Sequence, residues 1–189
     1  MTRITSLLVS ALLLLSVTAC AGVKGDTKQE KRNAVQQMRK ETLSDLYKLS
    51  PGARQEIANS AGYAVFSNVG VNVLLVSTAR GWGVAHNNRT GNNTYMKMFS
   101  AGGGVGIGIK DFRGIFLFAN QQVFDSFVNS GWQAGGQAEL AVKAEDQGLA
   151  TAMAIDIAPG IKVYQLTETG IAVQATLQGT KYSKDDELN

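Results

Sequence analysis

The sequence is poor in the residues that build disulfides and metal centres. Its 189 residues include one cysteine, Cys20, one histidine, His86, and two prolines. A single cysteine excludes a disulfide framework within the chain, and one imidazole beside one thiol is too few for an ordinary zinc site. Any Ser-His arrangement is limited to His86. Because His86 lies where an apolar run meets a polar turn, we expect a solvated or hydrogen-bonded structural histidine.

Two other features that suggest chemistry have simpler explanations. The carboxylates Glu145-Asp146 and those of residues 185–187 lie in turn-like or terminal segments, where solvation explains them better than a glycosidase pair. The glycine-rich run 101–109 matches neither G-x-G-x-x-G nor G-x-x-x-x-G-K-[ST], which disfavours a phosphate-binding loop. Its alternating glycines predict instead one strand over 102–109, packed on both sides. We therefore predict a non-enzymatic protein with no catalytic residues, metal or cofactor.

The N-terminal leader predicts a lipid-anchored protein. Arg3 precedes an apolar stretch of roughly 14 residues, which is shorter than the ~20 that span a bilayer as a helix. The tetrad Val17-Thr18-Ala19-Cys20 then resembles the lipobox of bacterial lipoproteins. We expect cleavage before Cys20 and its modification by acyl chains such as palmitate, which anchor the protein in a membrane. The alternative is an ordinary secreted protein with an incidental cysteine.

The rest of the chain predicts a single domain. Residues 1–19 form the expected signal peptide, 20–26 a lipidated tether and 27–189 the domain. Ala21 stands where bacterial lipoproteins kept in the inner membrane often carry an aspartate. We therefore expect the mature protein to lie on the periplasmic face of the outer membrane. Without Arg3 the chain has 17 Lys and Arg against 15 Asp and Glu, and this balance gives no indication of nucleic-acid binding. The 21 glycines and two prolines are typical of a compact β-rich domain with tight turns.

Two helices and a run of strands are predicted. Apolar residues at three- and four-residue spacing predict an amphipathic helix over 27–49, and Ser50-Pro51 predicts the cap of a second helix ending near Ser60. Gln121 to Asn129 predict a short helix that covers one end of the sheet. The predicted strands are 63–66, 71–78, 82–87, 94–99, 103–110, 114–119, 132–144, 161–166 and 171–180, with hairpin turns at 87–92 and 110–114. The expected fold class is α+β, with N-terminal helices before a mainly antiparallel, β-barrel-like sheet.

The first predicted helix carries the candidate binding residues. Eight Lys and Arg residues between Lys24 and Arg54 outnumber the acidic residues there. Each basic side chain near an anionic membrane contributes on the order of 1 kcal/mol, so this face is a candidate for lipid headgroups, although a merely solvated helix face explains it as well. The lipid-binding candidates are Lys28, Lys31, Arg32, Arg39, Lys40 and Lys48.

Six segments together resemble the SYLF domain in its bacterial lipoprotein form. They are SAGYAVF (60–66), GGGVGIG (102–108), GIFLF (114–118), FDSF (124–127), GWQAG (131–135) and GIAVQATLQGTK (170–181). The similarity extends over about residues 34–182. It implies a β-barrel-like domain with N-terminal helices and phospholipid binding. Eukaryotic members bind phosphoinositides and, in yeast, actin filaments, but actin does not suit a chain with a lipobox. The family offers no catalytic residues.

Three functions follow as hypotheses. The first is a lipid-anchored envelope protein that binds phospholipid through the basic helix and apolar surface at one end of the sheet. The second is a structural envelope lipoprotein that recruits another envelope protein, whose identity the sequence does not give. The third and weakest is an enzyme of unknown type. A large exposed apolar groove favours the first, a flat polar face with a wet, self-complementary patch favours the second, and a deep pocket containing His86 with carboxylates favours the third.

Overall fold

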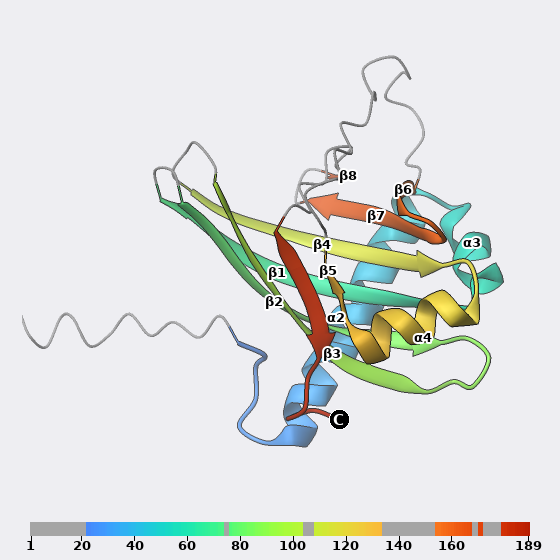
Figure 1. Ribbon diagram of the computed structural model, residues 1–189, viewed down its shortest axis with the longest axis horizontal. Helices are drawn as coiled ribbons and strands as arrows, with labels where there is room; N and C mark the ends of the chain where they lie inside the picture. The colour runs from blue at the N-terminus through green and yellow to red at the C-terminus, as the bar shows by residue number, and fades with distance from the viewer. Residues whose placement is uncertain (1–21, 74–75, 104–107, 134–153, 168–169, 172–178) are drawn as a thin grey trace, which may run out of the picture.

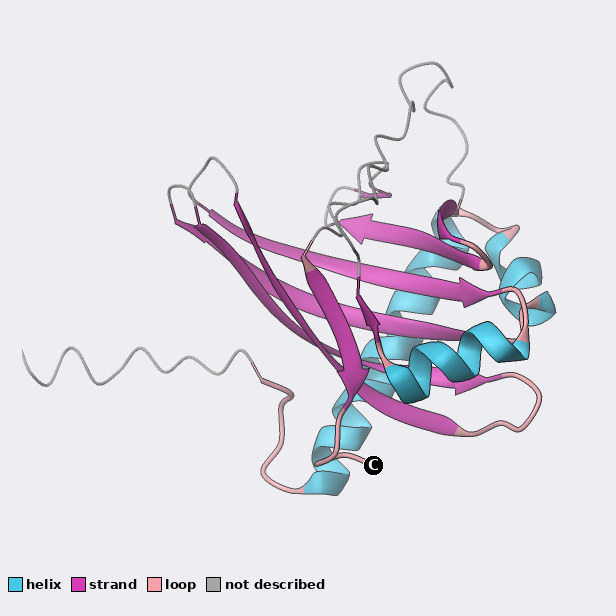
Figure 2. Cartoon of the chain, viewed as in Figure 1, coloured by secondary structure: helices cyan, strands magenta, loops and turns pink. Residues whose placement is uncertain are grey.

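The computed structural model of the chain describes residues 22–73, 76–103, 108–133, 154–167, 170–171 and 179–189 (Figure 1). Within these ranges the helices are α2 (Lys28–Leu49), α3 (Ala53–Asn59) and α4 (Gln121–Ser130). They pack against a curled antiparallel sheet, with α2 and α4 on opposite faces (Figure 2). The predicted α+β class is confirmed. None of the described helices is long and apolar enough to cross a membrane.

Helix α2 begins at a capping box and buries one stripe. The Thr27 hydroxyl accepts a hydrogen bond from the Glu30 backbone N–H at 3.2 Å, and the Glu30 carboxylate accepts one from the Thr27 N–H at 3.0 Å. This reciprocal pair satisfies backbone donors that an uncapped helix leaves free. The buried stripe consists of Val35, Met38, Thr42 and Leu46. The predicted helix over 27–49 is therefore confirmed.

The predicted cap of the second helix is wrong by two residues. Ser50 is the C-cap of α2, where its N–H donates to the Leu46 carbonyl at 2.7 Å. The N-cap of α3 is Gly52, with no side-chain capping bond. Pro51 thus lies in the turn between the helices, because the backbone of Ser50 is still engaged by α2. The end of α3 at Asn59, with Ser60 as C-cap, agrees with the prediction.

The sheet is antiparallel throughout its described ladders. Its path is β5-β9-β3-β2-β1-β4-β7-β6, and β8 pairs with β7. The strands are β1 (Gly62–Val73), β2 (Val76–Asn87), β3 (Asn93–Gly103), β4 (Gly108–Phe118), β5 (Trp132–Gln133), β6 (Ile155–Ala158), β7 (Ile161–Thr167), β8 (Gly170–Ile171) and β9 (Thr180–Lys184). The predicted hairpin at 87–92 joins β2 to β3 and is confirmed.

Three predictions about the strands are wrong. The segment 71–78 belongs to two strands, because β1 ends at Val73 opposite Val76, the first residue of β2. The predicted turn 110–114 lies inside β4, paired with β1, and Arg113 meets Asp45 of α2 at 3.5 Å. The predicted strand 102–109 is divided between β3 and β4, which are separated in the sheet by β2 and β1. The charges and the glycine at 110–114 resemble a turn locally but are compatible with a long paired strand. At 71–78 and 102–109 a residue pattern typical of strands continues across the ends of two strands, so it does not mark where either strand stops.

Other differences concern the C-terminal third. The predictions missed β6, and they ended the last strand at Thr180, where β9 begins. Of the predicted strand 132–144, the structure describes only Trp132–Gln133, and of 171–180 only its ends. The centre of the glycine-rich strand, including Gly104 and Gly106, and the carboxylates Glu145 and Asp146 also lie outside the described residues.

The sheet curls strongly around one face. Tyr182 on β9 and Phe116 on β4 are four steps apart along the sheet, which in a flat sheet corresponds to roughly 19 Å. Their ring centroids are nevertheless 5.0 Å apart. The side chains of distant strands therefore meet across a concave face. Figure 1 shows the curvature of these strands.

Helix α4 fills one end of this concave face. Its N-cap Asn120 accepts a hydrogen bond from the Val123 N–H at 3.0 Å, and the helix buries Phe124, Phe127 and Val128. Phe124 packs against Gly62, the first residue of β1, because a Cβ built on Gly62 would lie 2.6 Å from the Phe124 ring. The predicted helix at 121–129 is confirmed, and it covers an end of the curled sheet.

Candidate functional site

The basic residues at the start of α2 hold the C-terminal segment (residues 185–189) rather than facing solvent alone. Lys31 pairs with the Glu187 carboxylate, and Lys28 donates to the backbone oxygen of Asn189. The guanidinium of Arg32 donates to the Leu188 carbonyl at 2.7 Å. Three of the six lipid-binding candidates therefore hold this segment.

Apolar packing reinforces this attachment. Leu188 is 2% exposed and belongs to the core cluster between α2 and the sheet. Asn189 bonds both backbone groups of Tyr95 on β3, accepting from its N–H at 3.0 Å and donating to its carbonyl at 2.8 Å. The Arg32 guanidinium also lies 5.4 Å from the centroid of the Tyr95 ring. The segment is thus an integral part of the fold, and removing its basic partners would loosen it.

Electrostatics agree with the pairing of Lys31 and Glu187. The hydrogen bond and charge of Lys31 hold the pKa of Glu187 below its usual value. The reciprocal hydrogen bond from Glu187 raises the pKa of Lys31. Both side chains are partly solvated, so water and salt screen this ion pair. We therefore assign the attachment of the segment mainly to Leu188.

The other candidates on α2 differ in their surroundings. Arg39 donates to Asn93 Oδ1 at 2.9 Å, which also lies 2.9 Å from His86 Nδ1. His86 is therefore hydrogen-bonded, as expected. Lys48 pairs with Asp45 at 2.9 Å on an exposed surface. Among the described residues, Lys40 is exposed and has no side-chain partner.

A second basic surface, which the sequence analysis missed, lies on the convex face. Arg80 on β2, Phe99 on β3 and Lys181 on β9 are direct register partners, so they form one row across three strands. Lys97 lies two residues before Phe99 on the same side of β3. All four are exposed, and Phe99 is 48% exposed. We name these four residues the convex patch.

The composition of the convex patch distinguishes it from ordinary surface. A single exposed aromatic ring is common on soluble proteins. Here three basic residues occupy positions next to Phe99 on the same face of the sheet, and no described acidic side chain forms an ion pair with any of them. In the sequence, the alternation of Lys97 and Phe99 with the buried Met96 and Met98 could have indicated an exposed basic-aromatic face. The pairing with Lys181, 82 residues later than Phe99, required the tertiary structure.

Cys20, the predicted lipidation site, lies outside the described residues. Within the described ranges, no group of three or more His, Cys, Asp or Glu side chains is placed to hold a metal ion. His86 neighbours Arg39, Asn93 and the Tyr63 ring, whose centroid is 5.2 Å away. These neighbours give it a structural setting.

Comparison with known proteins yields one informative similarity. No family profile matches this chain. The chain is 35% identical over 162 residues to Beta cell expansion factor A from Aeromonas veronii. That alignment covers 86% of this chain and 60% of the relative, so the chain spans about three fifths of the length of the curated protein it matches.

Proposed function

We propose that this chain is a non-enzymatic, lipid-anchored protein of the cell envelope whose SYLF-like domain binds anionic phospholipid. In this proposal acylated Cys20 holds the protein on the periplasmic face of the outer membrane, and the domain then meets the headgroups directly. The observation that carries the proposal is the convex patch, where Arg80, Lys97 and Lys181 are neighbours of the half-exposed Phe99 on one face of the sheet.

The chemistry of the convex patch suits a membrane interface. Cations attract anionic headgroups, while an aromatic ring inserts at the boundary between headgroups and acyl chains. The residues lie on paired strands, so their spacing is held by the sheet rather than by a loop. The basic face of α2 is a weaker candidate because Lys28, Lys31 and Arg32 already bind the C-terminal segment. Lys40 is the α2 candidate best placed to add to the interaction.

Vesicle binding by residues 21–189 tests the proposal without the anchor. We expect binding to vesicles that contain phosphatidylglycerol, weak binding to pure phosphatidylcholine, and a decrease as salt shortens the Debye length from ~10 Å at 0.1 M to ~3 Å at 1 M. Replacing Arg80, Lys97 and Lys181 with glutamine should weaken the free energy of vesicle binding by on the order of 3 kcal/mol, which is a loss of about 100-fold in affinity. Phe99→Ser should weaken binding at every salt concentration.

A matched variant separates the effect of the convex patch from the effect of net charge on binding. Lys24, Arg89 and Lys162 are exposed residues away from the patch, and their triple replacement with glutamine removes the same charge. We expect this control to lose much less affinity. Equal losses in the two triple variants would reject the convex patch as the site. Absence of any vesicle binding would reject phospholipid binding and favour recruitment of another envelope protein.

A further inference from the structure

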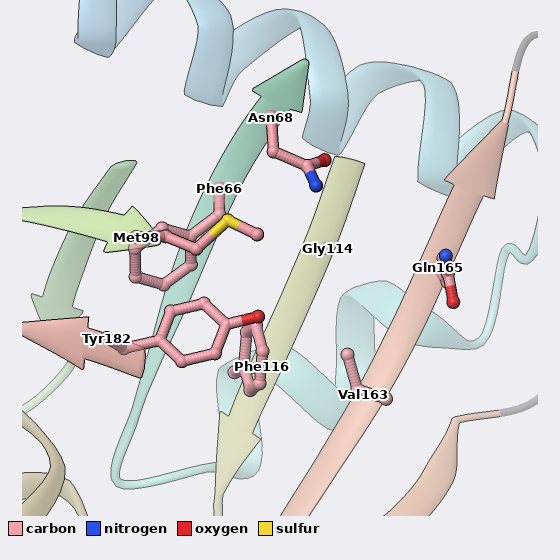
Figure 3. Close-up of a pocket in the computed structure, with 8 residues that line it drawn as sticks. All are labelled: Phe66, Asn68, Met98, Gly114, Phe116, Val163, Gln165 and Tyr182. Atoms are coloured by element: carbon pink, nitrogen blue, oxygen red, sulfur yellow. The ribbon is translucent and has the colours of Figure 1, made fainter. Parts of the chain in front are cut away.

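A narrow pocket lies on the concave face of the sheet, among side chains of β1, β3, β4, β7 and β9. Its walls include the rings of Phe66, Phe116 and Tyr182 and the thioether of Met98 (Figure 3). Two amide side chains, Asn68 on β1 and Gln165 on β7, complete the lining. The cavity volume is about 10 Å³, which is close to what one water molecule needs. The pocket therefore admits a single small polar group as it stands.

The two amides are buried with unsatisfied polar atoms. Asn68 is 2% exposed and Gln165 is 8% exposed. Among the described residues, no hydrogen-bond partner reaches Asn68 Nδ2, Asn68 Oδ1 or Gln165 Oε1. A buried polar group without a partner destabilises a fold, so such groups are uncommon in native proteins unless they bind something. Two of them beside one pocket therefore point to a ligand.

The sheet register explains why the pocket lies here. Gly114 on β4 is opposite Phe66 on one side and Gln165 on the other. Because Gly114 has no side chain, it leaves the space between these two strands open, and Figure 3 shows its strand passing between the two amides. A Cβ at Gly114 would already lie 3.3 Å from the Phe116 ring. The glycine thus keeps the floor of the pocket clear.

The unsatisfied atoms specify the chemistry of the ligand. Asn68 Oδ1 and Gln165 Oε1 are acceptors, and Asn68 Nδ2 is a donor. A hydroxyl group suits this set because it both donates and accepts. An ionised carboxylate does not, since it only accepts and no cationic side chain is among the described residues that line the pocket. The aromatic walls favour an apolar body attached to that hydroxyl.

We propose that the pocket binds a neutral, single-chain amphiphile through its hydroxyl group, which bonds one of the two amides, Asn68 or Gln165. This site is separate from the convex patch, which lies on the opposite face of the sheet, and it does not depend on anionic lipid. The apolar body of the ligand enters where Met98 now lies, because an unbranched methionine changes rotamer more readily than the packed rings do. Its hydroxyl then bonds an amide atom that has no partner among the described residues.

Binding of 1-octanol to the mature chain, residues 20–189 with Cys20→Ser, tests the proposal. The serine prevents the protein's own acyl chain from competing. Trp132 is the reporter, because its ring centroid is 5.8 Å from Tyr182 and 6.2 Å from Phe116, and Trp82→Phe removes the second tryptophan. We expect a saturable fluorescence change with octanol. The methyl ether of octanol and octanoate at pH 8 should bind at least about tenfold more weakly, because the ether cannot donate and the carboxylate is charged.

Apolar replacements of the amides provide the second measurement. Of Asn68→Leu and Gln165→Met, made separately, the variant that removes the bonding amide should abolish the preference for octanol over its ether. Without ligand, each variant should melt at or above the temperature of the parent, because each removes a buried unsatisfied group. Asn33→Leu, at an exposed position on α2, is the control and should keep the preference.

Three outcomes would overturn the proposal. Equal affinity for octanol and its ether in the parent would show that the hydroxyl is not recognised, and this test requires no variant. Absence of saturable binding would mean that the pocket holds solvent only. A lower melting temperature in the amide variants, with octanol affinity unchanged, would make Asn68 and Gln165 structural residues.

Discussion

The ring of Phe66 on β1 lies over the bare Cα of Gly83, its register partner on β2. A Cβ built on Gly83 would be 2.5 Å from Phe66 Cδ1 and 2.2 Å from the Val65 carbonyl oxygen. Phe66 in turn meets Tyr182 with ring centroids 4.7 Å apart. The aromatic cluster of the concave face therefore depends on a position without a side chain.

Gly83→Ala should destabilise the protein because neither Phe66 nor the Val65 backbone has room to move. Overpacking of this kind costs about 1–3 kcal/mol. The free energy of unfolding in urea is the measurement. Gly52→Ala is the control, since no atom lies within 4 Å of its Cβ position and its φ of −65° suits any residue. An unfolding curve of Gly83→Ala that overlays the parent would contradict the close approach.

Leu188→Ala should also destabilise the fold, although it lies next to the last residue of the sequence. The side chain is 2% exposed in the core beneath α2, and truncating such a leucine costs about 2–5 kcal/mol. Calorimetric melting measures the effect. Glu187→Ala, at the exposed neighbouring position, should change the melting temperature far less. Similar melting of parent and Leu188→Ala would show that the segment is not part of the core.

The attachment of residues 185–189 should weaken in acid. Lys31 lowers the pKa of Glu187, so the folded state holds this carboxylate ionised at pH values where the unfolded chain begins to bind a proton. The contribution is present above the usual glutamate pKa and disappears as pH falls through the lowered value. Amide hydrogen exchange of Leu188 as a function of pH measures it after correction for intrinsic rates. Glu187→Gln should remove this dependence, and an identical profile in the variant would exclude the pair as its cause.

Alkaline pH should destabilise the protein above about pH 10. Burial and the nearby Glu56 carboxylate raise the pKa of Tyr164 to about 12, and burial also raises the pKa of Tyr182. In the unfolded chain these tyrosine hydroxyls lose their protons near pH 10, whereas in the folded protein they keep them to higher pH. Stability therefore falls as pH rises above about 10, until the pKa of the folded state is reached. Melting temperatures between pH 9 and 12 measure the decline. Tyr164→Phe should reduce its slope, whereas an unchanged slope would place the cause elsewhere.

Cys20→Ser should prevent acylation and leave the protein soluble or unprocessed. The expected wild-type product begins at Cys20 and carries acyl chains, because the tetrad before it resembles a lipobox. Membrane fractionation and mass analysis of the mature N-terminus provide the measurement. An unmodified wild-type chain that begins several residues after Cys20 would contradict lipidation.

The sequence alone determined the elements whose signals are local. Helix α2 follows from its apolar spacing, and α4 follows from Val123, Phe124, Phe127 and Val128 at helical spacing. The hairpin between β2 and β3 follows from a run of Asn and Gly residues between two apolar runs. A single cysteine and a single histidine also limited the available chemistry before any fold was known.

Only the tertiary structure decided which basic and polar residues are engaged. Lys31 and Arg32 are ordinary exposed helix residues by sequence, yet they bind a segment 156 residues away. Lys181 joins Phe99 only because β9 pairs with β3, and Asn68 faces the same pocket as Gln165 only because β4 lies between their strands. Local spacing specifies which face of a strand a side chain occupies. The curl and register of the sheet determine which distant face it meets, because they arise from the packing of the whole core.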